Sequence, residues 1–388
     1  MLYWDNAATT PMYEEVIDSM TEVMRTYYGN PSSLHRLGVE AERLVNRARE
    51  TIAAALACSP EELRFTAGGS ESNNLAIFGV ARQYRSRGNH LITTQIEHAS
   101  VYDSFRQLEL EGFRVTYLPV DANGIVDINE LEAALTEETI LVSVMYVNNE
   151  VGSIQPIAEI GKLLEGRPKT LFHVDAVQAV GKLPVQPKEL NADLLSCSAH
   201  KLRGPKGTGF LYVRRGVELA TLIYGGGQEQ GVRSGTENVP SIVGMAKAVR
   251  MAVQEQPSFA ERTAAIRQAL VQCIEQTPGL YLSGSADGTN MASWIVHFTF
   301  PGMKSEVVVH ALEQHDIYVS TRSACSSGAS KPSRVLSAMG YEPDRAVGGI
   351  RLSFNLQHTM ADAKRFCLVL QQVVEELSHT VQTEGRRS

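Results

Sequence analysis

The sequence lacks the features that mark membrane, secreted and nucleic-acid-binding proteins. Its 388 residues include no apolar run long enough to span a bilayer, and its first residues lack the basic and apolar stretches of a signal peptide. The net charge is −7, and no basic block offsets it. We therefore expect a cytoplasmic protein that enters no membrane and makes no direct contact with nucleic acid.

Cysteine is also scarce, and its spacing excludes the usual cysteine frameworks. The cysteines lie far apart, at Cys58, Cys197, Cys273, Cys325 and Cys367. Because no Cys-x-x-Cys pair occurs, they indicate neither a disulfide framework nor a zinc or iron–sulfur ligand set, and we expect no metal. Cys197, Cys273 and Cys367 stand in apolar contexts that are typical of small buried residues, whereas Cys325 stands in a small, polar segment.

Length and composition predict a globular protein of two domains. The chain is too long for one simple core, and a content of 43% hydrophobic and 20% charged residues is ordinary for globular proteins. Apolar runs alternate with helical patterns as far as residue 213, which is typical of an α/β domain with a mostly parallel sheet. The expected strands are 64–66, 90–94, 114–118, 140–147, 170–174, 192–197 and 210–213, and the expected helices are 12–27, 37–56, 70–87, 100–111, 128–135 and 157–164.

After residue 240 the pattern changes to that of a smaller α/β unit. Helices are expected at 241–255 and 259–277, and the intervening residues 256–258 are the expected hinge because they contain a proline. The remaining expected strands are 294–300, 317–320 and 350–354, and the remaining expected helices are 305–315, 332–339 and 360–382.

Three stretches in the first part outline a site for pyridoxal phosphate (PLP). Lys201 closes Ser198-Ala-His-Lys201 at a strand end; alone, it would be interpreted as a solvated loop charge. Asp175 also follows an apolar run, and a carboxylate there can keep a proton on a ring nitrogen. Residues 66–74 open a helix with small residues, and exposed N–H groups at such a start bind phosphate. A Schiff-base lysine, an aspartate and a phosphate cradle are the parts that PLP needs.

These stretches resemble the cysteine desulfurases of the NifS/IscS kind, which have the class V aminotransferase fold. The similarity extends over nearly the whole chain, with motifs in the family's order at 3–10, 28–33, 97–98, 147–152, 225–228, 233–236 and 323–326. It implies a PLP-dependent transferase of fold type I. The implied domains are a large PLP-binding domain of residues 15–256 and a small α/β domain of residues 1–14 and 257–388.

The resemblance also implies roles for individual residues around PLP. Lys201 would carry PLP as a Schiff base and move protons at the substrate's α-carbon. Asp175 would pair with the ring nitrogen, Gln178 would donate to the ring's phenolic oxygen, and His98 would stack on the ring and assist proton transfer. The implied phosphate ligands are Gly69, Ser70, Ser198, His200 and, from the other subunit of a homodimer, Thr236.

The implied substrate is L-cysteine, and the implied nucleophile is Cys325. Arg351 would bind the substrate carboxylate, and Asn149 would help while touching the cofactor. Cys325 lies in a segment whose length to Pro332 resembles the long-loop branch of the family, where an exposed thiolate attacks the substrate sulfur. The reaction would yield L-alanine and a persulfide on Cys325.

The chain departs from the family's pattern at three places. The family more often has Ala-Thr where this chain has Gly69-Ser70, but backbone donors and a hydroxyl remain, so we expect phosphate binding to survive. Arg322 stands where the family usually has glycine, and it would either favour the nearby thiolate or stiffen its loop. Phe354-Asn355 stands where glycine commonly follows the arginine motif, which leaves the local backbone shape open.

Other readings of the same residues stay open at this point. A PLP-dependent transaminase or lyase that does not use Cys325, and a selenocysteine lyase, would share the fold. A hypothesis outside the enzymes is a partner-binding sulfur carrier with a vestigial PLP site. The complete set of site residues argues against this hypothesis. The sulfur acceptor is open between an iron–sulfur scaffold protein, a tRNA thiolation enzyme and a DNA phosphorothioation system.

Overall fold

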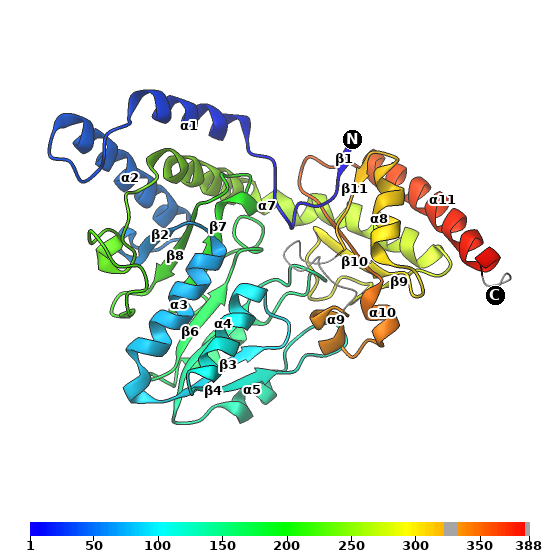
Figure 1. Cartoon of the computed structure of the whole chain (residues 1–388), viewed down its shortest axis with the longest axis horizontal. Coiled ribbons are helices and arrows are strands. Elements are labelled where there is room, and N and C mark those ends of the chain that lie inside the picture. Colours follow the sequence, from blue (N-terminus) through cyan, green and yellow to red (C-terminus); the bar gives the residue numbers. More distant parts are fainter. Residues whose placement is uncertain (322–331, 385–388) are drawn as a thin grey trace.

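Seven strands form the large sheet, in the order β2-β8-β7-β6-β5-β3-β4 (Figure 1). The structure, a computed structural model, describes residues 1–321 and 332–384. Neighbours from β7 to β4 pair in parallel, whereas β8 pairs antiparallel with β2 and β7, so the predicted mostly parallel sheet is confirmed. The strands are β2 Leu63–Thr66, β3 His90–Thr94, β4 Arg114–Leu118, β5 Thr139–Met145, β6 Leu171–Asp175, β7 Leu194–Ser198 and β8 Gly209–Val213.

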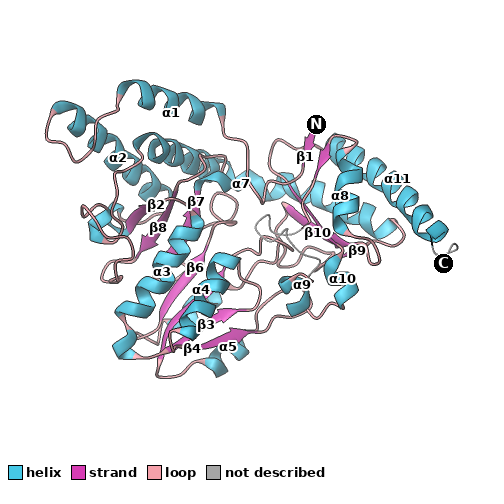
Figure 2. Ribbon diagram, viewed as in Figure 1, coloured by secondary structure: helices cyan, strands magenta, loops and turns pink. Residues whose placement is uncertain are grey.

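Helices bury both faces of this sheet (Figure 2). Every residue of β5 and β6 is buried, which is why these strands are mostly apolar rather than alternating between apolar and polar residues. Successive side chains of a strand point to opposite faces: Leu141 belongs to a buried cluster that includes residues of α3 and α4, and Val142 belongs to another that includes residues of α2, α5, α6 and α7. These helices are α2 Arg36–Ala55, α3 Gly69–Gln83, α4 Ala99–Leu110, α5 Ile128–Ala134, α6 Ile157–Leu164 and α7 Val239–Gln276.

Two small sheets and the C-terminal helices form the second part of the molecule. One sheet has the antiparallel order β12-β10-β9, and in the other β1 pairs in parallel with β11. The elements are β1 Leu2–Tyr3, β9 Tyr281–Leu282, β10 Ile295–Thr299, β11 Ile317–Tyr318, β12 Gly349–Ser353, α8 Ser305–Glu313, α9 Arg334–Ala338, α10 Pro343–Val347 and α11 Met360–Glu384. The sequence does not predict β1, β9 or α10, because elements this short carry no clear periodicity.

The N-terminus belongs to the core of this second part. Trp4 is fully buried and packs edge-on against Phe354, with ring centroids 5.4 Å apart. Its cluster also contains residues of α7, α8, β10, β12 and α11. The division into residues 15–256 and residues 1–14 with 257–388 stays a prediction, and this shared cluster supports it.

The predicted break between two helices at 256–258 is wrong. A single helix, α7, passes through Pro257 and runs from the large-sheet part into the second part (Figure 1). Proline removes one helical hydrogen bond and clashes with the preceding turn, but packing holds both sides of it. Ala252 and Phe259 are buried, and Phe259 packs edge-on against Trp294 at 5.4 Å between ring centroids.

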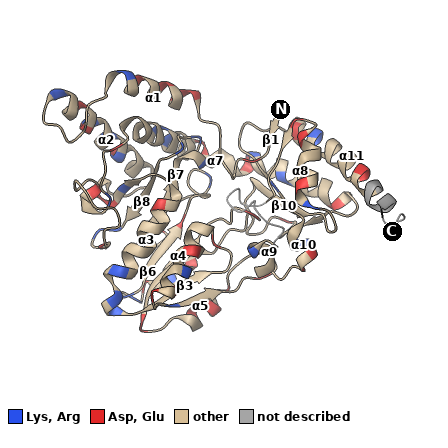
Figure 3. Ribbon diagram, viewed as in Figure 1, with Lys and Arg blue, Asp and Glu red and all other residues tan. Residues whose placement is uncertain are grey.

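The remaining helical segments of the described chain are one α-helix near the N-terminus and several short 3-10 turns. These are α1 Glu14–Thr26 and the short 3-10 turns η1 Pro60–Glu62, η2 Arg85–Arg87, η3 Ala199–Lys201 and η4 Glu229–Gly231. Charged residues are most frequent on the outer helices, and few lie on the strands of the large sheet (Figure 3). Within residues 1–321 and 332–384, no helix combines the length and the apolar character needed to cross a membrane.

Candidate active site

One cavity lies at the carboxyl ends of β5, β6 and β7, where the large-sheet part faces β12. Its volume is about 750 Å³, part of it open to solvent. It is the position at which parallel sheets bind ligands. The predicted site residues that line it are Gly69, Ser70, His98, Asn149, Asp175, Gln178, Ser198, His200, Lys201 and Arg351.

Lys201 reaches the cavity from η3, which directly follows β7. Its ammonium nitrogen Nζ donates to the carbonyl oxygens of Ala7 and Ala8, each at 2.6 Å. Both acceptors belong to the N-terminal segment, nearly two hundred residues away in the sequence. The lysine therefore points into the site rather than into bulk solvent, as a Schiff-base lysine must.

Asp175 ends β6 and is held from two sides. Its Oδ2 accepts from Asn73 Nδ2 at 2.8 Å, and its Oδ1 accepts from the backbone N–H of Val177 at 3.0 Å. Asp175 is 5% exposed, so these two donors replace the hydrogen bonds to water that its carboxylate loses on burial. A carboxylate fixed in this way can pair with a protonated ring nitrogen.

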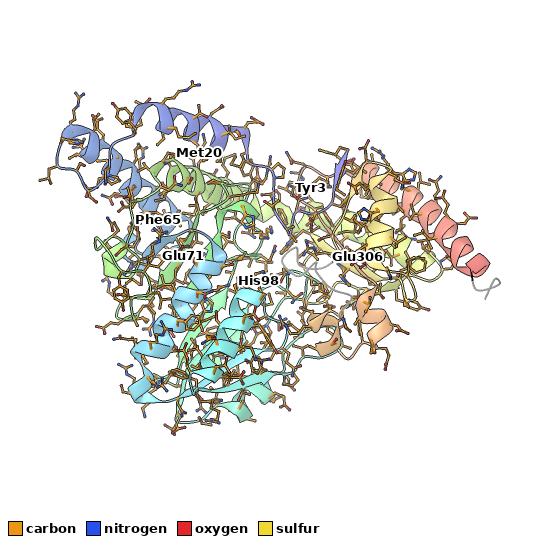
Figure 4. All side chains as sticks on the ribbon, in the orientation of Figure 1. Tyr3, Met20, Phe65, Glu71, His98 and Glu306 are labelled. Atoms are coloured by element: carbon orange, nitrogen blue, oxygen red, sulfur yellow. The ribbon has the colours of Figure 1, made fainter. Side chains whose placement is uncertain are left out.

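His98 caps the start of α4, near the middle of the molecule (Figure 4). Its Nδ1 accepts from the backbone N–H of Ser100 at 3.2 Å, which places the ring proton on Nε2. Burial lowers the pKa of His98; the charge of Asp175 opposes this, and those of Lys201 and Arg334 add to it. The imidazole is therefore neutral near pH 7, and its face and Nε2 are available to a bound ring.

The start of α3, where the phosphate cradle is predicted, lines the cavity with Gly69 and Ser70. A Cβ atom added to Gly69 would lie 2.7 Å from Val177 Cγ2 and 3.5 Å from Ser198 Cβ, so a larger residue there would require the Val177 side chain to shift. The first N–H groups of a helix have no helical acceptor and carry the positive end of its dipole. The Gly69-Ser70 departure therefore keeps the backbone donors, and the serine still lines the cavity.

His200 adds a neutral imidazole beside this cradle. Its Nδ1 lies 3.2 Å from the hydroxyl of Thr9. Burial lowers the pKa of His200 to about 4, and the positive charges of Lys201, Lys206 and Lys182 act in the same direction. At neutral pH the ring can donate one hydrogen bond to a phosphate without bringing a second charge.

Gln178 also contacts the N-terminal segment. Its Nε2 donates to the carbonyl of Ala7 at 2.9 Å, and its Oε1 is buried without a partner among the described residues. The amide nitrogen has a second hydrogen for the predicted bond to a phenolic oxygen. The lysine, the aspartate, the glycine cradle and the neutral imidazoles together fit a PLP molecule.

Arg351 lies on β12 at the wall opposite the large sheet. Its side chain is 1% exposed, Nη1 donates to the carbonyl of Asn149 at 2.8 Å, and Nη2 donates to Asp5 Oδ1 at 2.7 Å. Two of the five guanidinium donors are thus occupied, and the remaining three leave capacity for a carboxylate.

The remaining sequence-based expectations concern Thr236, Cys325, Arg322 and Asn355. Thr236 is exposed and does not line the cavity of its own chain. Cys325 and Arg322 lie outside the described residues. Asn355, at the third departure from the family's pattern, donates to Asn6 Oδ1 at 2.9 Å and so joins the N-terminal segment.

Sequence reasoning missed the groups that hold the site residues. Asn73 and Ser100 line the cavity and support Asp175 and His98, while the Ala7 and Ala8 carbonyls hold Lys201. The spacing of Asn73, three residues after Ser70 on one helix, could have indicated it, because residues i and i+3 share a helix face. Backbone carbonyls carry no signal in the sequence.

Comparisons with known proteins show which family and which relatives this chain is similar to. The family described as aminotransferase class-V matches residues 2–366. The chain is 42% identical over 376 residues to cysteine desulfurase IscS of Clostridium botulinum, covering 97% of this chain and 94% of that protein. It is 47% identical over 354 residues to the cysteine desulfurase of Mus musculus, covering 90% and 76%.

Solved structures similar to this chain include proteins of the same kind. A NifS-like protein superposes with a TM-score of 0.90 at 38% identity, covering 96% of this chain and 99% of that one. The structure of SspA in complex with cysteine superposes with a TM-score of 0.80 at 37% identity, covering 91% and 99%.

The support that Asn73 gives Asp175 can be tested by cofactor affinity. We expect Asn73→Ala to weaken PLP binding about tenfold, because a buried carboxylate loses a charge-assisted hydrogen bond. The measurement is a spectroscopic titration of the PLP-free protein with PLP. The matched control is Asn74→Ala, since Asn74 donates only to backbone carbonyls at Ser70 and Ser100. Equal affinities for the two variants would contradict the assignment.

Proposed function

This chain belongs to the class-V aminotransferases and is a PLP-dependent cysteine desulfurase, and from that premise we propose that Lys201, Arg351 and Cys325 divide the reaction between them. In this proposal the enzyme converts L-cysteine to L-alanine and keeps the sulfur as a persulfide on Cys325. The observation that carries the proposal is that Lys201, Asp175 and Arg351 line one cavity, with a glycine cradle at its edge.

Bound PLP supplies an electron sink for the negative charge that develops at the substrate's α-carbon. The start of α3 at Gly69 and Ser70, with Ser198 and His200, would hold its phosphate, and Asp175 would hold its ring nitrogen. Lys201 is proposed to anchor the cofactor and then to carry a proton to and from the α-carbon. His98 would cover the ring and exclude water from that face.

Arg351 is proposed to orient the substrate through its carboxylate. A guanidinium and a carboxylate form two parallel hydrogen bonds, which fix direction as well as position. Asn149 supports this arrangement because its carbonyl accepts from Arg351 Nη1 and its residue lines the cavity. A carboxylate held at this wall would direct the substrate's amino group towards Lys201 on the opposite wall.

Cys325 is proposed to take the sulfur. Its thiolate attacks the sulfur of the substrate, so a sulfur–sulfur bond forms as the carbon–sulfur bond breaks. The electron pair stays with the carbon fragment, which takes up protons and leaves as L-alanine. No external oxidant is required, because sulfur is oxidised as the S–S bond forms while the carbon that loses it is reduced to the methyl group of L-alanine. The thiol hydrogens of L-cysteine and Cys325 supply the protons of L-alanine and of the persulfide.

The described end of the segment that carries Cys325 supports this role. Ser333 donates to Glu150, the neighbour of Asn149, and Arg334 donates to the carbonyl of Glu97, the neighbour of His98. Cys325 and Ser333 are eight positions apart in the sequence, and an extended chain of eight residues spans up to about 26 Å. This length supports the proposal, because Ser333 and Arg334 contact the sequence neighbours of Asn149 and His98, which line the cavity.

The proposed enzyme is a cytoplasmic homodimer that passes its sulfur to an acceptor protein. Thr236 is proposed to reach the phosphate bound by the other subunit, and its exposure, with no role in its own cavity, supports this. The acceptor is proposed to be an iron–sulfur scaffold protein or a thiolation enzyme acting on RNA or DNA.

Replacing Cys325 separates substrate binding from sulfur transfer. We expect Cys325→Ser to keep the change in visible absorbance when L-cysteine binds. Its rate of alanine formation should fall by about 99% or more, because a hydroxyl is a far poorer nucleophile than a thiolate. The control is Cys58→Ser: burial raises the pKa of Cys58 to about 12, so that thiol stays protonated and idle. Near wild-type turnover by Cys325→Ser would replace the desulfurase mechanism with a transaminase or lyase mechanism at this site.

Mixing two inactive variants tests the shared site. Lys201→Ala and Thr236→Ala, refolded together, are expected to regain roughly a quarter of wild-type activity, because half of the dimers are hybrids and each hybrid has one intact site. Alanine release and sedimentation are measured on the same samples. A fully active monomer, or no recovery in confirmed hybrid dimers, would contradict the role of Thr236.

A further inference from the structure

The charge of Arg351 is balanced inside the protein by one carboxylate. The guanidinium is almost completely buried, and among the described residues its ion-pair partner is Asp5, with Oδ1 2.7 Å from Nη2. The Asn149 carbonyl accepts from Nη1 at 2.8 Å, and Nε is buried without a partner in the described chain. The orientation of the guanidinium therefore depends on two acceptors, one of which is a side chain.

Asp5 is itself fixed by the backbone around it. It pairs with Ser353, two residues beyond Arg351 on β12, in a short parallel bridge. The carbonyls on either side of this bridge are used as well: Trp4 O accepts from Ser353 N at 2.7 Å, and Ser353 O accepts from Asn6 N at 3.1 Å. Backbone hydrogen bonds thus attach the segment around Asp5 to β12, and the Asp5 carboxyl group, 20% exposed, lies beside the Arg351 guanidinium.

A buried arginine held in this way responds strongly to the loss of one partner. Removing one member of a buried ion pair leaves the other charge uncompensated and its donor unsatisfied. The guanidinium would then rotate towards other acceptors. Two parallel hydrogen bonds to a carboxylate tolerate little rotation, because both N–H groups must point at their oxygens.

We propose that Asp5 is a positioning residue for substrate recognition: it holds the Arg351 guanidinium in the orientation in which its remaining N–H groups bind the α-carboxylate of the amino-acid substrate. This rests on the role of Arg351 given under the proposed function. The rigid seat of Asp5 on β12 favours positioning over the opposite role, in which Asp5 would compete with the substrate carboxylate for the arginine.

The test compares two ligands that differ only in the carboxylate. The PLP-loaded enzyme is titrated with L-alanine and with ethylamine, and dissociation constants are read from visible absorbance. Asp5→Ala is expected to weaken L-alanine binding about tenfold, as for a lost charge-assisted contact, and to change ethylamine binding by less than about twofold, since ethylamine makes no contact with the arginine. Asp5→Asn should lie between, because its amide oxygen still accepts a hydrogen bond without the charge.

Two further variants separate the possible failures. Tyr3→Phe removes the bond from the Tyr3 hydroxyl to the Thr9 carbonyl in the same segment, and it should leave both ligands unaffected. Arg351→Lys should weaken L-alanine binding, and adding Asp5→Ala to it should cost less than about a further twofold. If Arg351→Lys binds L-alanine normally, the proposed role of Arg351 fails; if it binds weakly but Asp5→Ala and Asp5→Asn bind normally, only the positioning role fails.

Two other results would also overturn the proposal. Tighter L-alanine binding by Asp5→Ala would mean that Asp5 competes with the substrate. Equal weakening for L-alanine and ethylamine would mean that Asp5 only maintains the fold. Thermal unfolding midpoints of all variants are recorded, and Asp5→Asn, which preserves shape, decides the case if Asp5→Ala does not fold.

Discussion

The hydrogen bonds from Lys201 Nζ to the carbonyls of Ala7 and Ala8 connect the two parts of the molecule at the site. The N-terminal segment begins in the second part, where Trp4 is buried among aromatic rings. It ends against the large-sheet part, where Thr10 donates to the carbonyl of His200. This one short segment supplies the Ala7 and Ala8 carbonyls that hold Lys201 and the Asp5 carboxylate that holds Arg351. The positions of Lys201 and Arg351 therefore both depend on it.

The charges of the site are fixed, and its imidazoles are neutral. Arg351 and Asp175 each have hydrogen-bond partners at two positions, which limits their rotation. Burial lowers the pKa of both His98 and His200, so neither ring adds a charge near pH 7. In such a site the proton that must move at the substrate can be carried by the amine of Lys201, while the surrounding charges orient the reactants.

The sequence predicted the larger sheet and the cavity because both depend on strong local patterns. The buried strands β5, β6 and β7 are mostly apolar, and Asp175 and Ser198 are the last residues of β6 and β7. The break predicted at Pro257 failed because packing on both sides overrides a local helix breaker. Asp5 and the Ala7 and Ala8 carbonyls could not be predicted, because their contacts join residues far apart in the chain and involve backbone atoms.

The central claim is that Lys201, held at this junction, is the residue that binds PLP. Reduction of the PLP-loaded enzyme with borohydride, followed by peptide mass spectrometry, identifies the lysine directly, because reduction makes the bond between cofactor and lysine permanent. The account predicts a single pyridoxyl label on the peptide that contains Lys201. A label on Lys206, or on Lys182 behind the cavity, with Lys201 unmodified, would contradict it.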